Sequence, residues 1–359
     1  MRNAKRVFFP LDEQLGLQDP HYSPGLLKEM IWLSGEEKSF EHAEEVMLRI
    51  GHLAISDSSI WRRKEQWGAV FKEIQDSERE RANTPSGAHA FHEQVRGSQQ
   101  RIGVSMDGTM VHIRQEGWKE LKVGCSFDIE VYPTWNKETQ EWEDLAHAVG
   151  NRYVAHLGGP EEFGQMLWAE AQRRGWEGAA DREVVGDGAP WVWNQVLEHF
   201  YDARQAVDWY HALEHLADTA GLLHGEGTPA AGKWYREAEK ALYQGHAERI
   251  ATTLLEAAVG YPQEVADKLR NQAAYLDTHK RRMQYLELRE EGYVIGSGMV
   301  ESGGKQFKAR FCGSGMRWSR DGIERLIPIR AATMGGCFDA AWRTAYNWSS
   351  SREQERAAA

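Results

Sequence analysis

Three carboxylates occupy short motifs in which an acidic side chain indicates chemistry. Asp107 lies inside a strand-like run, Asp187 at the carboxyl end of a short strand, and Glu301 near the start of a basic helix. A bare carboxylate in a strand is costly unless it is paired or binds a metal. Open α/β sheets bind ligands at the carboxyl ends of their strands. If the three acids converge, they could hold two Mg²⁺ ions about 4 Å apart, with Mn²⁺ as a substitute, for phosphoryl transfer.

A second motif predicts a different chemistry. The residues from His211 to His215 read H-A-L-E-H, which satisfies the H-x-x-E-H pattern of inverted zinc peptidases. Two imidazoles on one helical face, with Glu214 beside them, suit a zinc ion and a general base. A zinc metallopeptidase is therefore an alternative, and so is a helix whose His211 and His215 only pack or form hydrogen bonds.

The acids must be positioned by strands and helices, and the sequence predicts both. Strand-like segments are expected at 101–113, 121–132, 152–156, 181–185 and 205–208. Helical segments are expected at 160–174, from 189, at 210–223 and at 299–310. Three strands, a helix, and then strands alternating with helices indicate a mixed α/β domain. The helical periodicity of 224–291, with few strand signals, predicts an all-helical insertion into that domain.

The first hundred residues have helical periodicity. Apolar residues recur from Phe40 to Ile50, Gly51 breaks the pattern, and a second helix is expected through Phe71. Helix, glycine-containing turn and helix form the helix-turn-helix plan, whose second helix meets DNA. Arg62 and Arg63 lie near the start of that second helix. We therefore expect a DNA-binding unit, with a simple packed helical pair as the alternative.

The net charge of −11, from 43 basic and 54 acidic residues, disfavours nonspecific nucleic-acid binding by the chain as a whole. The segment 302–320 is nonetheless basic, without any acid, and it is interleaved with aromatic residues. Such a segment suits a phosphate backbone with stacking side chains, the alternative being a solvated face. Its cations are Lys305, Lys308, Arg310, Arg317 and Arg320.

Other broad classes are disfavoured by composition. No apolar run approaches the roughly 18 residues of a membrane-spanning helix, and the N-terminus lacks a signal-peptide pattern. A cytoplasmic location without a membrane partner is the resulting expectation. Cys125, Cys312 and Cys337 are odd in number and widely spaced, so they are expected to be reduced thiols.

The motifs also carry a resemblance. The strings SMDGT, VVGDGAPWVWN, DWYHALEHL and GSGMVESGGKQFKARF, followed by GMRWS, resemble the ISKra-type transposases of bacterial insertion sequences. These are DDE transposases with a ribonuclease H-like catalytic domain, and the resemblance covers about Phe8 to Trp342. It implies that Asp107, Asp187 and Glu301 bind the catalytic metals. Asp208 and His211 match a family pattern of an acid followed three residues later by a histidine.

The resemblance implies an activity and a domain plan. The activity is DNA cleavage at the ends of an insertion sequence and transfer of the cut strand to target DNA, by a homo-oligomer assembled on DNA at the bacterial nucleoid. A DNA-binding protein without catalysis is the remaining alternative. Family members carry a cysteine-rich segment before the sequence that resembles FFPLDEQLGL, whereas this chain has no cysteine before Cys125. The expected parts are a helical region at 1–90, a ribonuclease H-like domain at 96–223 and 292–348, the insertion at 224–291 and a disordered tail at 349–359.

Overall fold

The computed structural model describes residues 19, 21–84, 100–136 and 140–358. Contacts along the chain divide it into two compact units, each built from several segments. The smaller unit comprises Met1–Glu78, Met110–Lys119 and Gln306–Ala359, and the larger comprises Arg79–Thr109 and Glu120–Lys305. The boundary expected between residues 90 and 96 lies outside the described residues.

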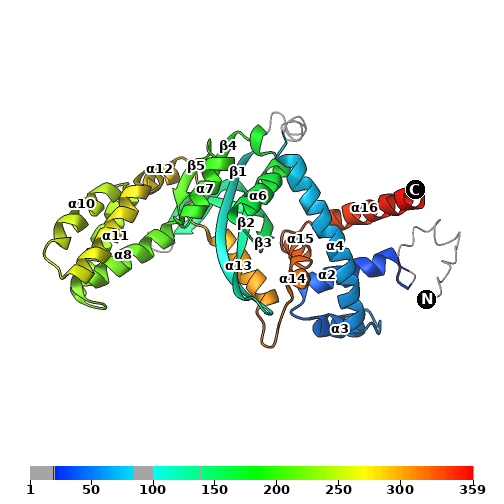
Figure 1. Cartoon of the computed structure of the whole chain (residues 1–359). Helices are drawn as coiled ribbons and strands as arrows, with labels where there is room; N and C mark the ends of the chain where they lie inside the picture. The colour runs from blue at the N-terminus through cyan, green and yellow to red at the C-terminus, as the bar shows by residue number, and fades with distance from the viewer. Residues whose placement is uncertain (1–18, 20, 85–99, 137–139, 359) are drawn as a thin grey trace. The chain divides into compact units, whose positions relative to one another are not determined.

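The strands form one five-stranded mixed sheet, drawn from cyan to green in Figure 1. They are β1 (Arg101–Ile113), β2 (Gly117–Asn136), β3 (Glu141–His156), β4 (Asp181–Gly186) and β5 (Arg204–Val207), in the spatial order β3-β2-β1-β4-β5. β1, β4 and β5 run parallel, whereas β2 and β3 pair antiparallel. This arrangement confirms the predicted mixed α/β class and is consistent with a ribonuclease H-like fold.

The central strands β1 and β4 carry apolar residues that are buried inside the larger unit. Ile102, Val104 and Met106 on β1 are buried, as are Val184 and Val185 on β4. Parallel strands buried on two sides read as continuous apolar runs, which made these strands recognisable in the sequence. β3 is different, because it begins at residue 141 rather than at the expected 152, and its first half is largely polar and partly exposed.

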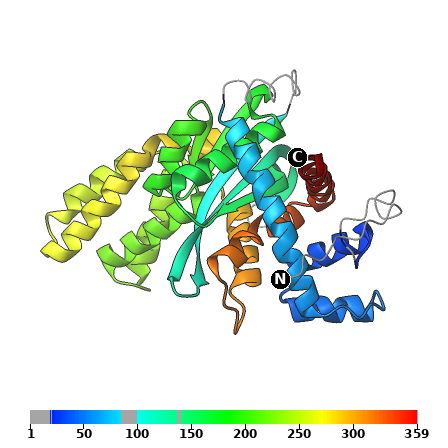
Figure 2. The same ribbon diagram turned by 45° about the vertical axis from the view of Figure 1, so that its right-hand side comes forward.

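Helices cover the sheet and extend from it. α6 (Pro160–Arg174) packs against α7 (Pro190–His199) and β3. The helical insertion consists of α8 (Trp209–His224), α9 (Pro229–Tyr243), α10 (Ala247–Ala258), α11 (Gln263–His279) and α12 (Tyr285–Glu290). Figures 1 and 2 show α8, α10 and α11 running side by side away from the sheet. One apolar core continues from the strands into these helices.

The smaller unit is helical and has a core of its own. Its helices include α2 (Pro24–Glu36), α3 (Phe40–Arg49), much of α4 (Asp57–Ala82), α14 (Arg320–Glu324), α15 (Ile327–Met334) and α16 (Phe338–Ala358). Met30, Leu33, Met47 and Ile60 belong to this core. Both helices of the expected helix-turn-helix pair are present, but α4 has 26 residues and is longer than predicted.

α16 continues as a helix through the segment 349–358, where a disordered tail was expected. The physical reason is local, because Arg, Glu, Gln and Ala in this segment favour helix and no glycine or proline interrupts it. Within the described residues, no helix is both long and apolar enough to span a membrane.

A buried acid on β4 makes the stability of the larger unit depend on pH. Glu183 is fully buried, and its Oε2 accepts a hydrogen bond of 3.1 Å from the backbone N–H of Val294. Burial raises the pKa of Glu183 well above the ordinary carboxyl value. The folded protein therefore holds a proton that the unfolded chain releases, so this acid lowers stability as pH rises above the unfolded pKa.

We expect Glu183→Gln to reduce this dependence. Between about pH 5 and pH 8, the free energy of unfolding should fall less in the variant than in the wild type, as measured by urea denaturation. Glu198→Gln, at an exposed position on α7, should keep the wild-type dependence. An identical pH dependence in Glu183→Gln and the wild type would contradict the prediction.

Candidate active site

Asp107 lies on β1, directly after the buried Met106, and is partly buried. Its Oδ1 accepts a hydrogen bond of 2.6 Å from the backbone N–H of Gly108. Burial raises the pKa of Asp107, and the negative charges of Asp187 and Glu301 raise it further. The three predicted acids are therefore close enough to interact electrostatically, and all three belong to the larger unit.

The register of the parallel strands positions Asp187 beside Asp107. Met106 on β1 pairs with Gly186 on β4, so each acid is the next residue along its own strand direction. Asp187 Oδ1 accepts a hydrogen bond of 2.9 Å from the N–H of Ala189. Asp107, midway along β1, and Asp187, directly after the end of β4, therefore follow the same paired position of the two strands.

The turn after Asp187 requires glycine. Gly188 has φ +96°, and a Cβ there would lie 2.8 Å from the Tyr275 ring on α11. The Tyr275 hydroxyl in turn donates to the carbonyl oxygen of Asp187 at 3.2 Å. The insertion helix α11 therefore supports the backbone of this catalytic candidate.

Glu301 lies in the first turn of α13 (Gly298–Phe311). The beginning of this helix is held against β3, because the Tyr153 hydroxyl donates to the carbonyl oxygen of Met299 at 3.2 Å. The close approach depends on Gly303, where a Cβ would lie 2.5 Å from the Tyr153 ring. The Glu301 carboxylate accepts from Ser297 Oγ at 3.4 Å and lies 3.6 Å from Lys305 Nζ.

Asp208 joins the segments that carry these acids. It is 1% exposed and caps α8, with Oδ1 accepting from the N–H of His211 at 2.6 Å. Its Oδ2 accepts from the N–H of Ser297 at 2.5 Å, immediately before α13. Since both oxygens are bonded to backbone donors, Asp208 positions the helix of Glu301.

The H-A-L-E-H motif forms part of a packed aromatic cluster. The His211 and His215 rings lie 5.0 Å apart at 84°, and His215 stacks on Tyr275 at 3.8 Å. His215 Nδ1 makes a hydrogen bond of 2.7 Å with Gln272 Oε1, and burial lowers the pKa of His215. These contacts explain the two histidines as packing residues of α8, and nothing in them favours a zinc peptidase.

The donor set of the three acids fits a hard cation, because carboxylate oxygens are preferred ligands of Mg²⁺. Burial is the main cause of the raised pKa of Asp107, and the negative charges of Asp187 and Glu301 add to it; a bound cation would offset those charges. Within the described residues, however, no three His, Cys, Asp or Glu side chains are grouped closely enough to hold a metal ion as they stand.

Sequence reasoning missed a fourth acid near this site. Glu120 on β2 adds to the negative charges that raise the pKa of Asp107. It contacts Lys122 Nζ, which lies 4.9 Å from the centre of the Trp191 ring. Only the pairing of β2 with β1 brings Glu120 to Asp107, and a single sequence contains no signal for that register.

The predicted DNA-binding cations of the segment 302–320 differ in exposure. Lys305, Lys308 and Arg317 are exposed, in agreement with a role on the surface. Arg310 is 2% exposed, so its side chain does not lie on the surface where the prediction of a DNA contact would place it. Arg320 pairs with two acids in the smaller unit, including a 2.9 Å hydrogen bond to Glu116.

The two arginines of α4 also differ. Arg62 is exposed and donates to Ser59 Oγ at 3.3 Å. Arg63 pairs with Asp19 and lies 5.2 Å from the centre of the Tyr22 ring. Arg63 therefore stabilises the smaller unit, and Arg62 is the one of this pair whose side chain is exposed.

Comparison with known proteins gives a distant similarity. No protein-family model matches the chain. The UPF0236 protein in the vanSb 3′ region of Streptococcus gallolyticus is 24% identical over 152 residues, which are 42% of this chain. The match covers 32% of that protein, so the chain spans about a third of the length of this relative. The name of the relative states neither an activity nor a substrate.

We expect Asp208→Ala to lower the free energy of unfolding by about 2 to 4 kcal/mol, because it removes a helix cap and leaves the buried N–H of Ser297 without its acceptor. Asp208→Asn keeps one acceptor oxygen and should cost less. Guanidinium denaturation measures both effects, with Asp218→Ala at an exposed position of the same helix as the control. A loss in Asp208→Ala no larger than in the control would exclude the positioning role.

Proposed function

We propose that the chain is a DDE transposase, a metal-dependent polynucleotidyl transferase that cuts the ends of an insertion sequence and joins them to target DNA. The observation that carries the proposal is that Asp107 and Asp187 follow one paired position of two parallel strands and that Glu301 acts electrostatically on Asp107. The resemblance of the motifs around these acids to ISKra-type transposases supports the same conclusion, and the similarity to a UPF0236 protein is compatible with it.

The proposed mechanism assigns a role to each acid. Asp107 and Asp187 offer carboxylates from adjacent parallel strands, and Glu301 offers a third from α13. When bound, Mg²⁺ would activate the attacking oxygen and stabilise the leaving oxygen in each phosphoryl transfer. The paired strands β1 and β4 fix two of the ligands, and the hydrogen bond from Ser297 to Asp208 fixes the start of the helix that carries the third.

The proposed partners are the element ends, target DNA and further copies of this chain assembled on DNA. Lys305 and Lys308 are exposed on α13, the helix of Glu301, and extend from it toward solvent. Cations beside a carboxylate site attract the phosphate backbone that the site must cut. The same arrangement suits a protein at the bacterial nucleoid.

We expect Asp187→Asn to abolish Mg²⁺-dependent cleavage of a duplex that contains the sequences flanking the gene. The substitution removes one anionic ligand and keeps the side-chain shape, so the far-ultraviolet circular dichroism should not change. Mn²⁺ binding, followed by isothermal titration calorimetry, should weaken at least about tenfold, since a carboxylate ligand is lost. Calorimetry tests the site even where the cleaved sequence is not optimal.

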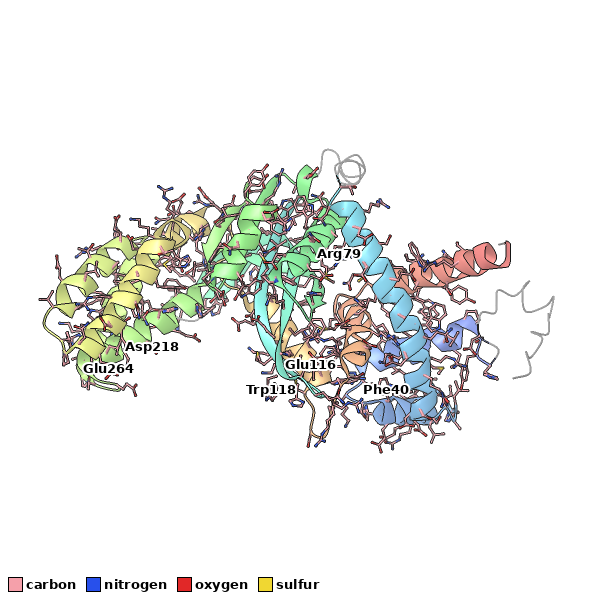
Figure 3. All side chains as sticks on the ribbon, viewed as in Figure 1. Phe40, Arg79, Glu116, Trp118, Asp218 and Glu264 are labelled. Carbon is pink, nitrogen blue, oxygen red and sulfur yellow. The ribbon has the colours of Figure 1, made fainter. Side chains whose placement is uncertain are left out.

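Asp218→Asn is the matched control, because Asp218 is exposed on the helical insertion, where Figure 3 labels it. This variant should cleave DNA and bind Mn²⁺ like the wild type. Normal cleavage by Asp187→Asn would overturn the proposed mechanism. Cleavage lost in Asp218→Asn as well would show that the effect does not come from the carboxylate site.

The salt dependence of DNA binding tests the basic face of α13. If Lys305 and Lys308 each contact one phosphate, their joint replacement by Gln should make the slope of log affinity against log salt shallower by about 2. The loss should be similar on end sequences and unrelated sequences, because phosphate contacts do not read bases. Fluorescence anisotropy at several salt concentrations measures the slope.

The double variant Lys233→Gln/Lys268→Gln provides the control, because both lysines are exposed on the insertion helices, at 75% and 55% of their side-chain surface. Its slope should equal that of the wild type. If Lys305→Gln/Lys308→Gln also keeps the wild-type slope, the phosphate path lies elsewhere on the protein.

A further inference from the structure

The smaller unit contains a cavity of about 500 Å³ that the proposed catalytic mechanism does not use. Three aromatic side chains line it, Phe40 at the start of α3, Trp61 on α4 and Trp318 before α14. Figure 3 labels Phe40 within this unit. Small-molecule sites have volumes of about 300 to 1,000 Å³, so the cavity is large enough for one planar ring with its substituents.

A buried guanidinium with a free donor forms part of the cavity wall. Arg310 is 2% exposed, and its Nε donates to the carbonyl oxygen of Ser34 at 3.1 Å. Its Nη2 is buried and has no hydrogen-bond partner among the described residues. The guanidinium carbon lies 5.0 Å from the centre of the Phe40 ring and 5.1 Å from that of Trp318.

The Nη2 donor of this cavity-lining residue has no acceptor within the part of the chain that the structure describes. Burial lowers the pKa of Arg310 to about 10, and the group remains charged at neutral pH. A buried donor without a partner costs free energy, and more so when it is charged. An acceptor oxygen or nitrogen from a ligand would satisfy Nη2, and the aromatic walls would receive the plane of the same ligand.

The acids of the cavity do not neutralise its cations. Four arginines line it, against the two carboxylates Glu65 and Asp321. Glu65 is already paired, with Arg325 Nη1 at 3.0 Å and with the buried Lys64. The cavity therefore keeps a positive field, in which an anionic ligand is favoured.

Two further arginines are exposed where they line the cavity. Arg114 and Arg317 make no ion pair within the part of the chain that the structure describes, and both side chains are accessible to solvent. Trp61, whose side chain is 45% exposed, lines the same cavity. The cavity therefore combines aromatic rings, a buried guanidinium N–H without an acceptor, and exposed arginines that make no ion pair among the described residues.

We propose that this cavity binds a single unstacked nucleotide of a DNA strand, with the base among Phe40, Trp61 and Trp318 and the phosphate beside Arg114 or Arg317. Every base has a π face that stacks on aromatic residues, and carbonyl oxygens or ring nitrogens of the base can accept from Arg310 Nη2. Arginine is also the preferred partner of phosphate oxygens.

The inference rests on the proposed function only in that the chain handles DNA. Binding is therefore measured in EDTA, where metal-dependent cleavage does not occur. Normal cleavage by Asp187→Asn would remove the proposed mechanism and leave the cavity test intact. Conversely, failure of the cavity test would leave the carboxylate site untouched.

The probes are two duplexes that share one strand containing 2-aminopurine, which pairs with thymine in the first and has no opposite nucleotide in the second, together with free deoxynucleoside monophosphates. The wild type should bind the duplex with the unpaired nucleotide about five to a hundred times more tightly, as expected for one stacked base. Stacking on tryptophan should also quench the 2-aminopurine fluorescence.

Trp61→Ala should reduce this preference to about one, because it removes the most exposed aromatic wall. Trp142→Ala, at a tryptophan 67% exposed on β3 and outside the cavity, should keep the preference and the quenching. Arg310→Lys keeps a positive charge but removes the Nη2 donor, so it should weaken the preference in protein whose far-ultraviolet circular dichroism matches that of the wild type.

The wild type could also bind the free monophosphates, and Trp61→Ala could abolish that binding. This result would support the cavity as a nucleotide site and identify a free nucleotide as its ligand. Equal affinity of the wild type for both duplexes, with no binding of monophosphates, would overturn the inference. A preference that survives in Trp61→Ala would overturn it as well, because another surface would then recognise the unpaired nucleotide.

Discussion

Like charges held close together are the constraint on which the larger unit depends. Asp107 and Asp187 follow one paired position of β1 and β4. The negative charges of Asp187 and Glu301 both raise the pKa of Asp107. Their repulsion opposes folding, so the structure that holds them must be rigid. The buried side chains of β1 and β4 supply that rigidity, because a closely packed core resists the small displacements that would separate the acids.

The rigid sheet positions only two of the acids, and the third depends on contacts between distant segments. α13 is fixed by the Tyr153 hydroxyl on β3 and by Asp208 at the end of β5. Asp208 is more buried than any of the three acids, yet its two oxygens are occupied by backbone donors. An acid in a sequence motif can thus position the backbone, because both of its carboxylate oxygens accept from backbone N–H groups.

The sequence predicted the fold well where burial produces apolar runs or a regular spacing of apolar residues. The parallel strands and the helices from α6 to α13 were expected near their observed positions, because apolar runs and 3.6-residue spacing mark them. The first half of β3 was missed, since a polar, partly exposed strand lacks such a pattern. The burial of Arg310 was also missed, although its spacing from Phe307 and Phe311 puts all three on one helical face. Glu120 could not be found, because its place beside Asp107 depends on strand pairing.

The two ends of the helical insertion meet at the sheet. Trp209, the first residue of α8, donates to the carbonyl oxygen of Ile295 at 2.8 Å, and Ser297 donates to Asp208. The chain therefore leaves the sheet and returns to it through one hydrogen-bonded junction. Closing a loop costs only slightly more free energy as the loop grows, when its ends already touch. Evolution can lengthen, shorten or exchange the segment between these ends as a module, and the carboxylates on either side keep their spacing.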